Sequence, residues 1–107
     1  MKRFISNYTI LTSGKEYINH ITTITDDNKL LSIEPFDREL GNTRYVPTPL
    51  CVTTSDHYNK VKKAFLASSS RQQFKQYLEG LKKHDAQEGN TVIILNLDFS
   101  SKTITQL

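Results

Sequence analysis

The sequence predicts an α+β protein, an antiparallel β-meander that forms a small sandwich or barrel, with a helical pair inserted before a C-terminal β-hairpin. Three observations lead to this class: apolar and polar residues alternate in the first third of the chain, the spacing becomes helical after residue 55, and an apolar run follows at residues 91–99. With 107 residues, we expect a single domain with β-structure at 3–54, a helical segment at 55–83 and β-structure at 91–107.

The N-terminal third predicts three antiparallel strands, at residues 4–11, 16–25 and 30–35. β-branched and aromatic side chains fill the first strand, which is typical of a half-buried sheet. Gly14 then supplies a turn conformation that other residues adopt only with strain. Asp and Asn residues at 26–29 favour a second turn, because their side chains bond to their own backbone. Together these segments predict a meander.

Two prolines predict an edge or a loop at the start of residues 45–54. Neither Pro47 nor Pro49 can donate a hydrogen bond to a neighbouring strand, so we expect this part to lie at a sheet edge or in a loop. Residues 50–52 then form a short apolar strand. The edge near residues 46–50 and the C-terminal hairpin are therefore candidate sites for pairing with another chain.

The apolar spacing becomes that of a helix at Ser55, which we expect to be an N-cap. One apolar stripe follows, made of Tyr58, Val61, Ala64 and Phe65. Three serines at 68–70 end this helix, and Ser70 with Gln73 forms a capping box for a second helix. The buried face of the second helix is expected to comprise Phe74, Tyr77, Leu78 and Leu81.

The most strand-like segment of the chain is residues 91–99. Four consecutive apolar residues, 92–95, predict a strand buried on both faces, with the meander on one side and the helices on the other. Residues 102–107 are expected to return as its hairpin partner. We therefore expect this terminal segment to be essential to the fold.

Several classes of protein are disfavoured by the residues that the chain lacks. A single cysteine excludes an intrachain disulfide and a multi-cysteine zinc site. The chain shows neither a secretory signal pattern nor an apolar stretch of membrane-spanning length, so we expect a cytoplasmic protein with no membrane contact.

The histidines and acidic residues, which commonly bind metals or catalyse reactions, are scattered along the sequence. The three histidines have no metal-ligand spacing, so we expect neither a metal nor another cofactor; they are His20, His57 and His84. Adjacent acids occur at residues 26–27, and Asp37 lies two residues before Glu39. Both acid pairs fall in predicted turns, where carboxylates are ordinarily solvated. No catalytic residue is predicted from either set.

Four segments, residues 5–11, 29–35, 45–50 and 92–98, follow one another in a recognisable order. This order resembles the small accessory β-domain, or composite domain, of the amidohydrolase superfamily of metal-dependent hydrolases. That family continues from the third segment into its catalytic barrel with a His-x-His pair of metal ligands, but no such pair is present here. About 30 helical residues are also too few for a barrel of roughly 250 residues. The resemblance implies the accessory domain without the barrel, and no catalytic residue.

We expect a non-catalytic β-module that acts through protein–protein contacts, either with itself as a homo-oligomer or with another protein. The alternative is binding of nucleic acid or another anionic ligand through the helical segment. Residues 55–84 hold seven Lys or Arg and only two Asp or Glu. The candidate anion contacts are Arg71, Lys75, Lys82 and Lys83, of which the first three fall on one stripe at helical spacing.

A second alternative is an enzyme that uses Cys51 as its nucleophile. Cys51 lies close to a predicted helix N-terminus, which can lower the pKa of a thiol. It also lies between Leu50 and Val52, where a buried cysteine behaves as a small apolar residue. We therefore expect Cys51 to belong to the core.

Overall fold

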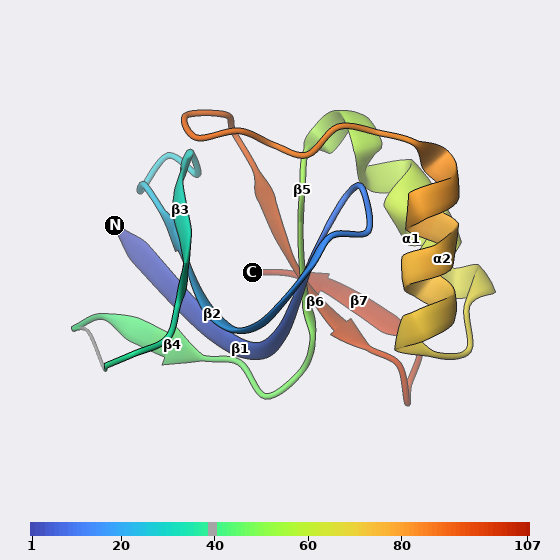
Figure 1. Ribbon diagram of the computed structural model, residues 1–107, viewed down its shortest axis with the longest axis horizontal. Helices are drawn as coiled ribbons and strands as arrows, with labels where there is room; N and C mark the ends of the chain where they lie inside the picture. The colour runs from blue at the N-terminus through green and yellow to red at the C-terminus, as the bar shows by residue number, and fades with distance from the viewer. Residues whose placement is uncertain (39–40) are drawn as a thin grey trace.

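The computed structural model describes residues 1–38 and 41–107, within which seven strands form one mixed sheet and two α-helices pack at one end (Figure 1). The α+β class predicted from the sequence is confirmed. The strands are β1 (Lys2–Leu11), β2 (Glu16–Ile24), β3 (Leu30–Pro35), β4 (Thr43–Tyr45), β5 (Leu50–Thr53), β6 (Ile93–Asp98) and β7 (Thr103–Gln106). A 3-10 helix, η1 (Ser55–His57), leads into α1 (Tyr58–Ala67), and α2 (Arg71–Leu81) follows.

The strand order is β3-β2-β1-β5-β6-β7, with β4 paired to the start of β1. Strands β1, β2 and β3 are antiparallel neighbours, which confirms the predicted meander. β6 pairs in antiparallel fashion with both β5 and β7. The two groups are joined by a parallel pairing of β1 with β5. The sheet is therefore mixed, and it is open rather than closed into the barrel that the sequence left as an option.

The segment that connects β4 to β5 is a loop, one of the two forms predicted for it, but it lies beside the central strand β1 and so is not the free pairing edge that was expected near residues 46–50. Val46 is buried, and its N–H donates to a carbonyl of β1 at 2.8 Å. The Ser6 hydroxyl contacts the Thr48 carbonyl at 2.8 Å. Pro47 and Pro49 lie between the residues of β4 and β5 that pair with β1. No strand hydrogen bond is therefore lost through their missing N–H groups.

The core has two parts, which lie on opposite faces of the central strands. The first joins the sheet to the helices and consists of Tyr8, Ile10, Cys51, Val61, Ala64, Phe65, Phe74, Leu78, Leu95 and Leu97. The second lies on the other face and consists of Phe4, Leu11, Ile24, Leu30, Val46, Leu50, Val52, Val92 and Ile94. β6 contributes to both parts, so the expected burial of this strand on both faces is confirmed.

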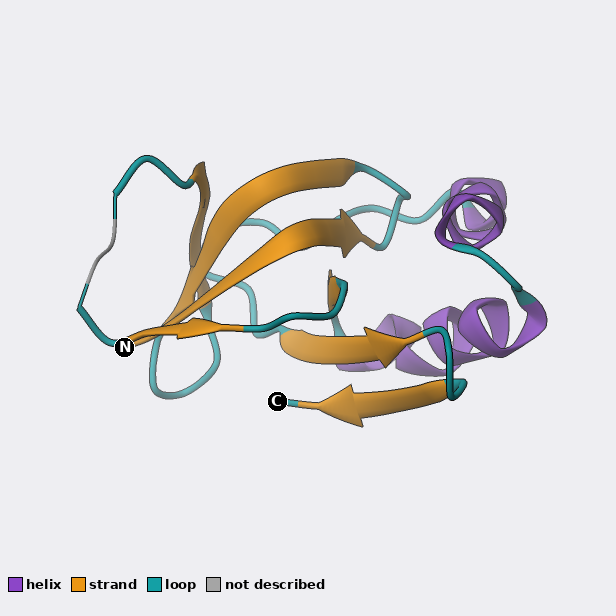
Figure 2. Cartoon of the chain, turned by 90° about the horizontal axis from the view of Figure 1, so that it is seen from below, coloured by secondary structure: helices purple, strands orange, loops and turns teal. Residues whose placement is uncertain are grey.

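The sheet curls around the second part of the core. An isolated bridge pairs Lys29 with Thr91, next to the start of β6. Beside it, the Val92 N–H donates to the Asn28 carbonyl at 2.8 Å and the Leu30 N–H donates to the Asn90 carbonyl at 2.9 Å. These bonds tie the β2–β3 turn to the far end of the sheet. Figure 2 shows the resulting curl, with the helices at one end.

The helix boundaries agree with the sequence at α2 and differ at α1. The Ser70 hydroxyl accepts from the Gln73 N–H at 3.1 Å, and the Gln73 side chain accepts from the Ser69 N–H at 2.7 Å. Ser55 is not an N-cap, because it lies inside η1, and Thr54 at the cap position makes no side-chain cap bond. No helix within the described residues is long and apolar enough to cross a membrane.

Candidate functional site

Cys51 lies in β5 with its side chain completely buried. Burial, with a smaller contribution from the Asp85 carboxylate, raises the pKa of the Cys51 thiol to about 12. The helix N-terminus that follows η1 therefore does not activate the thiol. This environment is that of a core residue, as the sequence led us to expect, and not that of a nucleophile.

We expect Cys51 in the folded protein to resist iodoacetamide from pH 7 to pH 9. Because the pKa of the thiol is raised, the reactive thiolate is scarce throughout this range. In urea the thiol becomes exposed and reacts at the rate of a free cysteine. Mass spectrometry with and without urea measures the difference, and fast alkylation of the folded chain would restore the cysteine-enzyme alternative.

The histidines and the described members of the acid pairs lie in separate places in the structure. His20 packs against the Tyr17 ring at a centroid distance of 4.8 Å, while His57 and His84 line a separate hollow. Asp26 is exposed and paired with the N-terminal ammonium group. Glu39 lies outside the described residues. In the part of the chain that the structure describes, no three His, Cys, Asp or Glu side chains are grouped to hold a metal.

A pocket of about 360 Å³ lies where the β1–β2 turn meets α2. The turn and α2 can lie this close together because residue 14 is a glycine: a Cβ atom there would come within 2.6 Å of the Glu79 side chain. Gly14 also has a φ of 93°, which other residues rarely adopt. The Lys75 ammonium donates to the Gly14 carbonyl at 2.7 Å and so fastens the turn to the helix.

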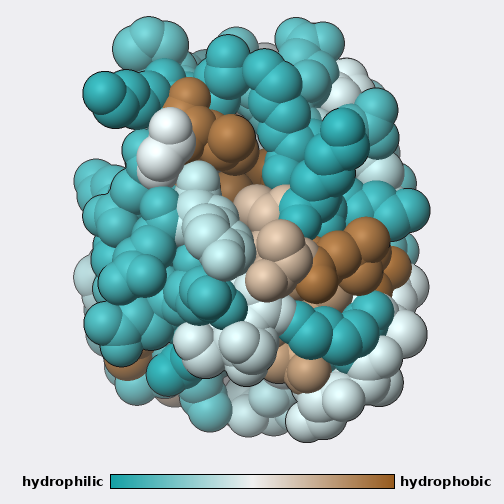
Figure 3. Space-filling model, turned by 90° about the vertical axis from the view of Figure 1, so that its right-hand side faces the viewer, coloured by the Kyte–Doolittle hydropathy of each residue, from teal (hydrophilic) through white to brown (hydrophobic). Residues whose placement is uncertain are grey.

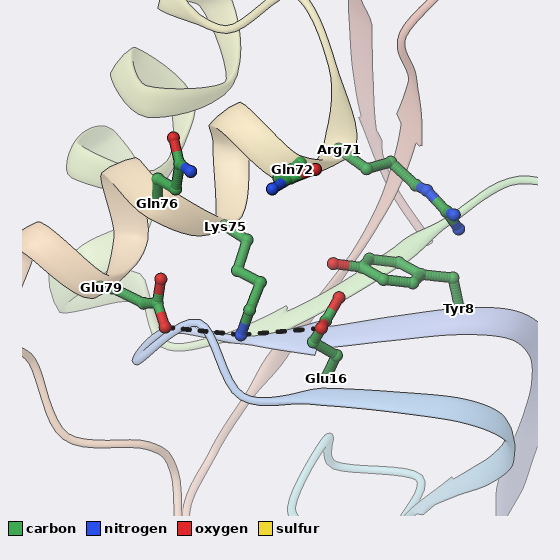
Figure 4. Close-up of a pocket in the computed structure, with 7 residues that line it drawn as sticks. All are labelled: Tyr8, Glu16, Arg71, Gln72, Lys75, Gln76 and Glu79. Carbon is green, nitrogen blue, oxygen red and sulfur yellow. Dashed lines mark ion pairs between the residues drawn. The ribbon is translucent and has the colours of Figure 1, made fainter.

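Charged side chains from the two elements meet in the pocket (Figure 4). The Lys75 Nζ lies 3.7 Å from Glu16 Oε1 and 3.5 Å from Glu79 Oε2. The side chain of Lys75 is 28% exposed, so solvent screens these pairs only in part. Lys75 is thus balanced by two carboxylates, and Gln72 and Gln76 complete the helical wall of the pocket.

Tyr8 and Arg71 form the other side of the pocket. The Arg71 guanidinium lies 4.4 Å from the centre of the Tyr8 ring, a cation–π contact. Tyr8 is only 3% exposed, and its hydroxyl makes no hydrogen bond of ordinary length and angle to a described residue, although the Glu16 carboxylate lies beside it. Burial and the neighbouring Glu16 carboxylate raise the pKa of Tyr8, so its hydroxyl stays protonated at neutral pH and can donate a hydrogen bond.

The exposed side of the two helices carries an apolar groove of about 330 Å³. Its lining residues are Lys60, Lys63, Ala64, Ala67, Tyr77 and Leu81. Tyr77 was expected in the buried face of α2, but it is 40% exposed because it lies on the flank that borders this groove. Figure 3 shows apolar side chains gathered at this end of the molecule and flanked by hydrophilic ones.

The four predicted anion contacts do not form one surface. Arg71 and Lys75 line the pocket near the start of α2. Lys82 follows the last turn of this helix in a left-handed conformation, with a φ of 54°. Lys83 lies instead beside Lys60, which faces the groove. The predicted stripe of Arg71, Lys75 and Lys82 therefore ends with the helix.

Only Arg71 and Lys75 of the seven pocket residues were predicted from the sequence as site residues, and the two that lie farthest from α2 in the chain had the weakest signal. Tyr8 and Glu16 lie on the β1–β2 hairpin, about 60 residues away from the helix that completes the pocket. The only local signal is a polar hydroxyl on the inward face of a strand, which many core tyrosines share. No protein-family model, curated protein or solved structure matches this chain. The resemblance to the amidohydrolase accessory domain stays a prediction from the sequence.

Proposed function

We propose that the protein is a non-catalytic interaction module whose helical groove binds an acidic amphipathic segment of another protein. The apolar groove between α1 and α2, which has lysines at its rim and no carboxylate among its lining residues, carries this proposal. A helix with apolar residues at intervals of three and four would fill such a groove. Acidic residues beside those apolar positions would meet the lysines.

The charge around the groove favours an acidic occupant. α1 contains no Asp or Glu, and the one acid of α2, Glu79, is paired with Lys75 on another side of the helix. The neighbouring Lys83 lowers the pKa of Lys60 below its usual range. The two ammonium groups thus repel each other, and carboxylates of a partner would relieve this repulsion.

The same charge argues against a second copy of the chain at this groove. A symmetric dimer contact would place the lysines of one groove against those of the other. Homo-oligomerisation would use β7 instead, since the outer side of this edge strand has no neighbour in the described sheet. The residues of β7 are Thr-Ile-Thr-Gln, without the charge or proline that commonly protects an edge.

The test measures binding of two designed helical peptides by fluorescence anisotropy. Both carry leucines at helical spacing, and they differ only in having glutamate or lysine at the flanking positions. We expect the acidic peptide to bind and the basic peptide not to bind. Ala67→Glu places a carboxylate in the groove and should weaken binding about tenfold or more. Leu66→Glu adds the same charge at a neighbouring exposed position outside the groove lining and should change binding less than about twofold.

Three results would contradict the proposal. Equal binding of the two peptides would show that charge does not determine binding. Equal effects of Ala67→Glu and Leu66→Glu would show that the peptide does not bind in the groove. Tighter binding of a single-stranded oligonucleotide than of the acidic peptide would favour the nucleic-acid alternative. Light scattering of the free protein then reports whether self-association competes with the peptide.

A further inference from the structure

The pocket between the β1–β2 turn and α2 contains polar groups whose bonding capacity the protein itself does not use. We propose that this pocket binds a small organic oxyanion, a carboxylate or a phosphate ester, with Arg71 pairing its anionic group and the Tyr8 hydroxyl donating to a second oxygen. This site is separate from the helical groove and does not depend on its function. At about 360 Å³, it is of the size found for small-ligand sites.

The Tyr8 hydroxyl is the first observation that points to a ligand. Tyr8 is 97% buried, and its hydroxyl makes no hydrogen bond of ordinary length and angle to a described residue, although the Glu16 carboxylate lies close enough to raise the pKa of Tyr8. Buried polar groups are nearly always hydrogen-bonded, because a lost bond to water is not otherwise replaced. Figure 4 shows the hydroxyl beside the Glu16 carboxylate and directed toward the space beneath α2, where an oxygen of a ligand would accept its hydrogen bond.

The second observation is Arg71, which lies above the Tyr8 ring at the first position of α2. No carboxylate in the described chain forms an ion pair with Arg71, whereas Lys75 on the next turn has two. The N-terminus of α2 also carries the positive end of the helix dipole, which adds to the attraction for an anion. Arg71 is exposed, so its guanidinium can adjust to an arriving ligand.

The remaining charges limit what the pocket accepts. The lining contains two cations and two carboxylates, so its net charge is zero. A highly charged chain such as a nucleic acid would meet Glu16 and Glu79 as well as Arg71. A small ligand with one anionic group and neighbouring hydroxyls fits better, since the carboxamides of Gln72 and Gln76 can bond to hydroxyls.

The test is a titration of the full chain followed by amide chemical shifts in NMR spectra. The probes are inorganic phosphate, glycerol 3-phosphate and malate, with glycerol as the uncharged control. We expect saturable shifts at Tyr8, Arg71 and Gln72 for glycerol 3-phosphate, malate or both, with a Kd below about 1 mM, and none for glycerol. The two organic probes distinguish a phosphate ligand from a carboxylate ligand.

Three variants complete the test. Arg71→Gln should weaken binding about tenfold or more, while Lys62→Gln removes the same charge from an exposed position of α1 outside the pocket and should leave binding unchanged. Tyr8→Phe should also weaken binding about tenfold, and its melting temperature should be equal to or above that of the natural chain, because it removes an unpaired hydroxyl.

The proposal is overturned by shifts that never saturate, by binding of glycerol equal to that of the acids, or by equal effects of Arg71→Gln and Lys62→Gln. Saturable binding of inorganic phosphate alone would mean an adventitious ion only. If Tyr8→Phe lowers the melting temperature, its effect on binding is not interpretable. The proposal is then tested by Arg71→Gln against Lys62→Gln, because both of these residues are exposed and their substitution should not disturb the fold. None of these results bears on the peptide groove, whose own test is separate.

Discussion

A chain truncated after Gly89 is expected to lose cooperative folding. The truncation removes β6, which lies between β5 and β7 and contributes buried side chains to both parts of the core. Ile94 faces one part and Leu95 the other, and each is at most 2% exposed. Their loss exposes the edge of β5 and the apolar side chains that β6 covers in both parts of the core. We expect the free energy of this lost burial to exceed the roughly 5–15 kcal/mol that stabilises such a domain.

Circular dichroism during heating measures this loss, and the truncated chain should show no sigmoidal melting transition. A chain that ends at Ser101 is the matched control, since it lacks only β7, an edge strand whose Ile104 is half-buried. We expect the control to melt cooperatively at a lower temperature than the full chain. A cooperative transition in the shorter chain would show that the core does not need β6.

Replacing Phe65 by alanine is expected to cost about 3–5 kcal/mol in the free energy of unfolding. Phe65 is fully buried, and its ring contacts those of Phe74 and Phe99 at centroid distances of 5.9 and 5.0 Å. These three rings join α1, α2 and the segment after β6. Alanine would leave a cavity at the point where the helices meet the sheet.

Urea denaturation followed by fluorescence or circular dichroism gives the change. Leu66→Ala is the control, because Leu66 is the next residue of α1 and is 51% exposed. Its substitution should alter stability by less than about 0.5 kcal/mol. If the two alanine variants were equally stable, Phe65 would not hold the position in the core that the structure gives it.

The parts of the fold that were predictable from the sequence depend on local patterns. Alternation located the strands of the meander, and Ser70 with Gln73 located the start of α2, because a cap is formed by residues three apart. The parallel pairing of β1 with β5 has no local signature, since it joins Thr9 to Leu50. Without that pairing, the prolines before β5 left an edge and a loop as the options, and nothing in the sequence showed that the loop lies beside the central strand.

The candidate pocket was predictable only in part, for a similar reason. Helical periodicity brought Arg71 and Lys75 onto one side of α2, which was correct as far as the helix extends. The same periodicity assumed that Lys82 continues the helix, whereas the left-handed conformation at Lys82 ends it. Tyr8 and Glu16 reach the pocket only through the docking of the β1–β2 turn on α2, which no spacing in the sequence encodes.

The central position of β1 has a consequence for how the chain is made. During synthesis, β1 is made before its neighbour β5, which begins at Leu50. β6, which contributes side chains to both parts of the core, begins only at Ile93. Because synthesis adds roughly 5–20 residues per second, the apolar side chains on both faces of the meander stay exposed for on the order of several seconds before β6 is made. The core is therefore completed only after β6 has been synthesised, and until then the exposed apolar side chains of the meander favour aggregation.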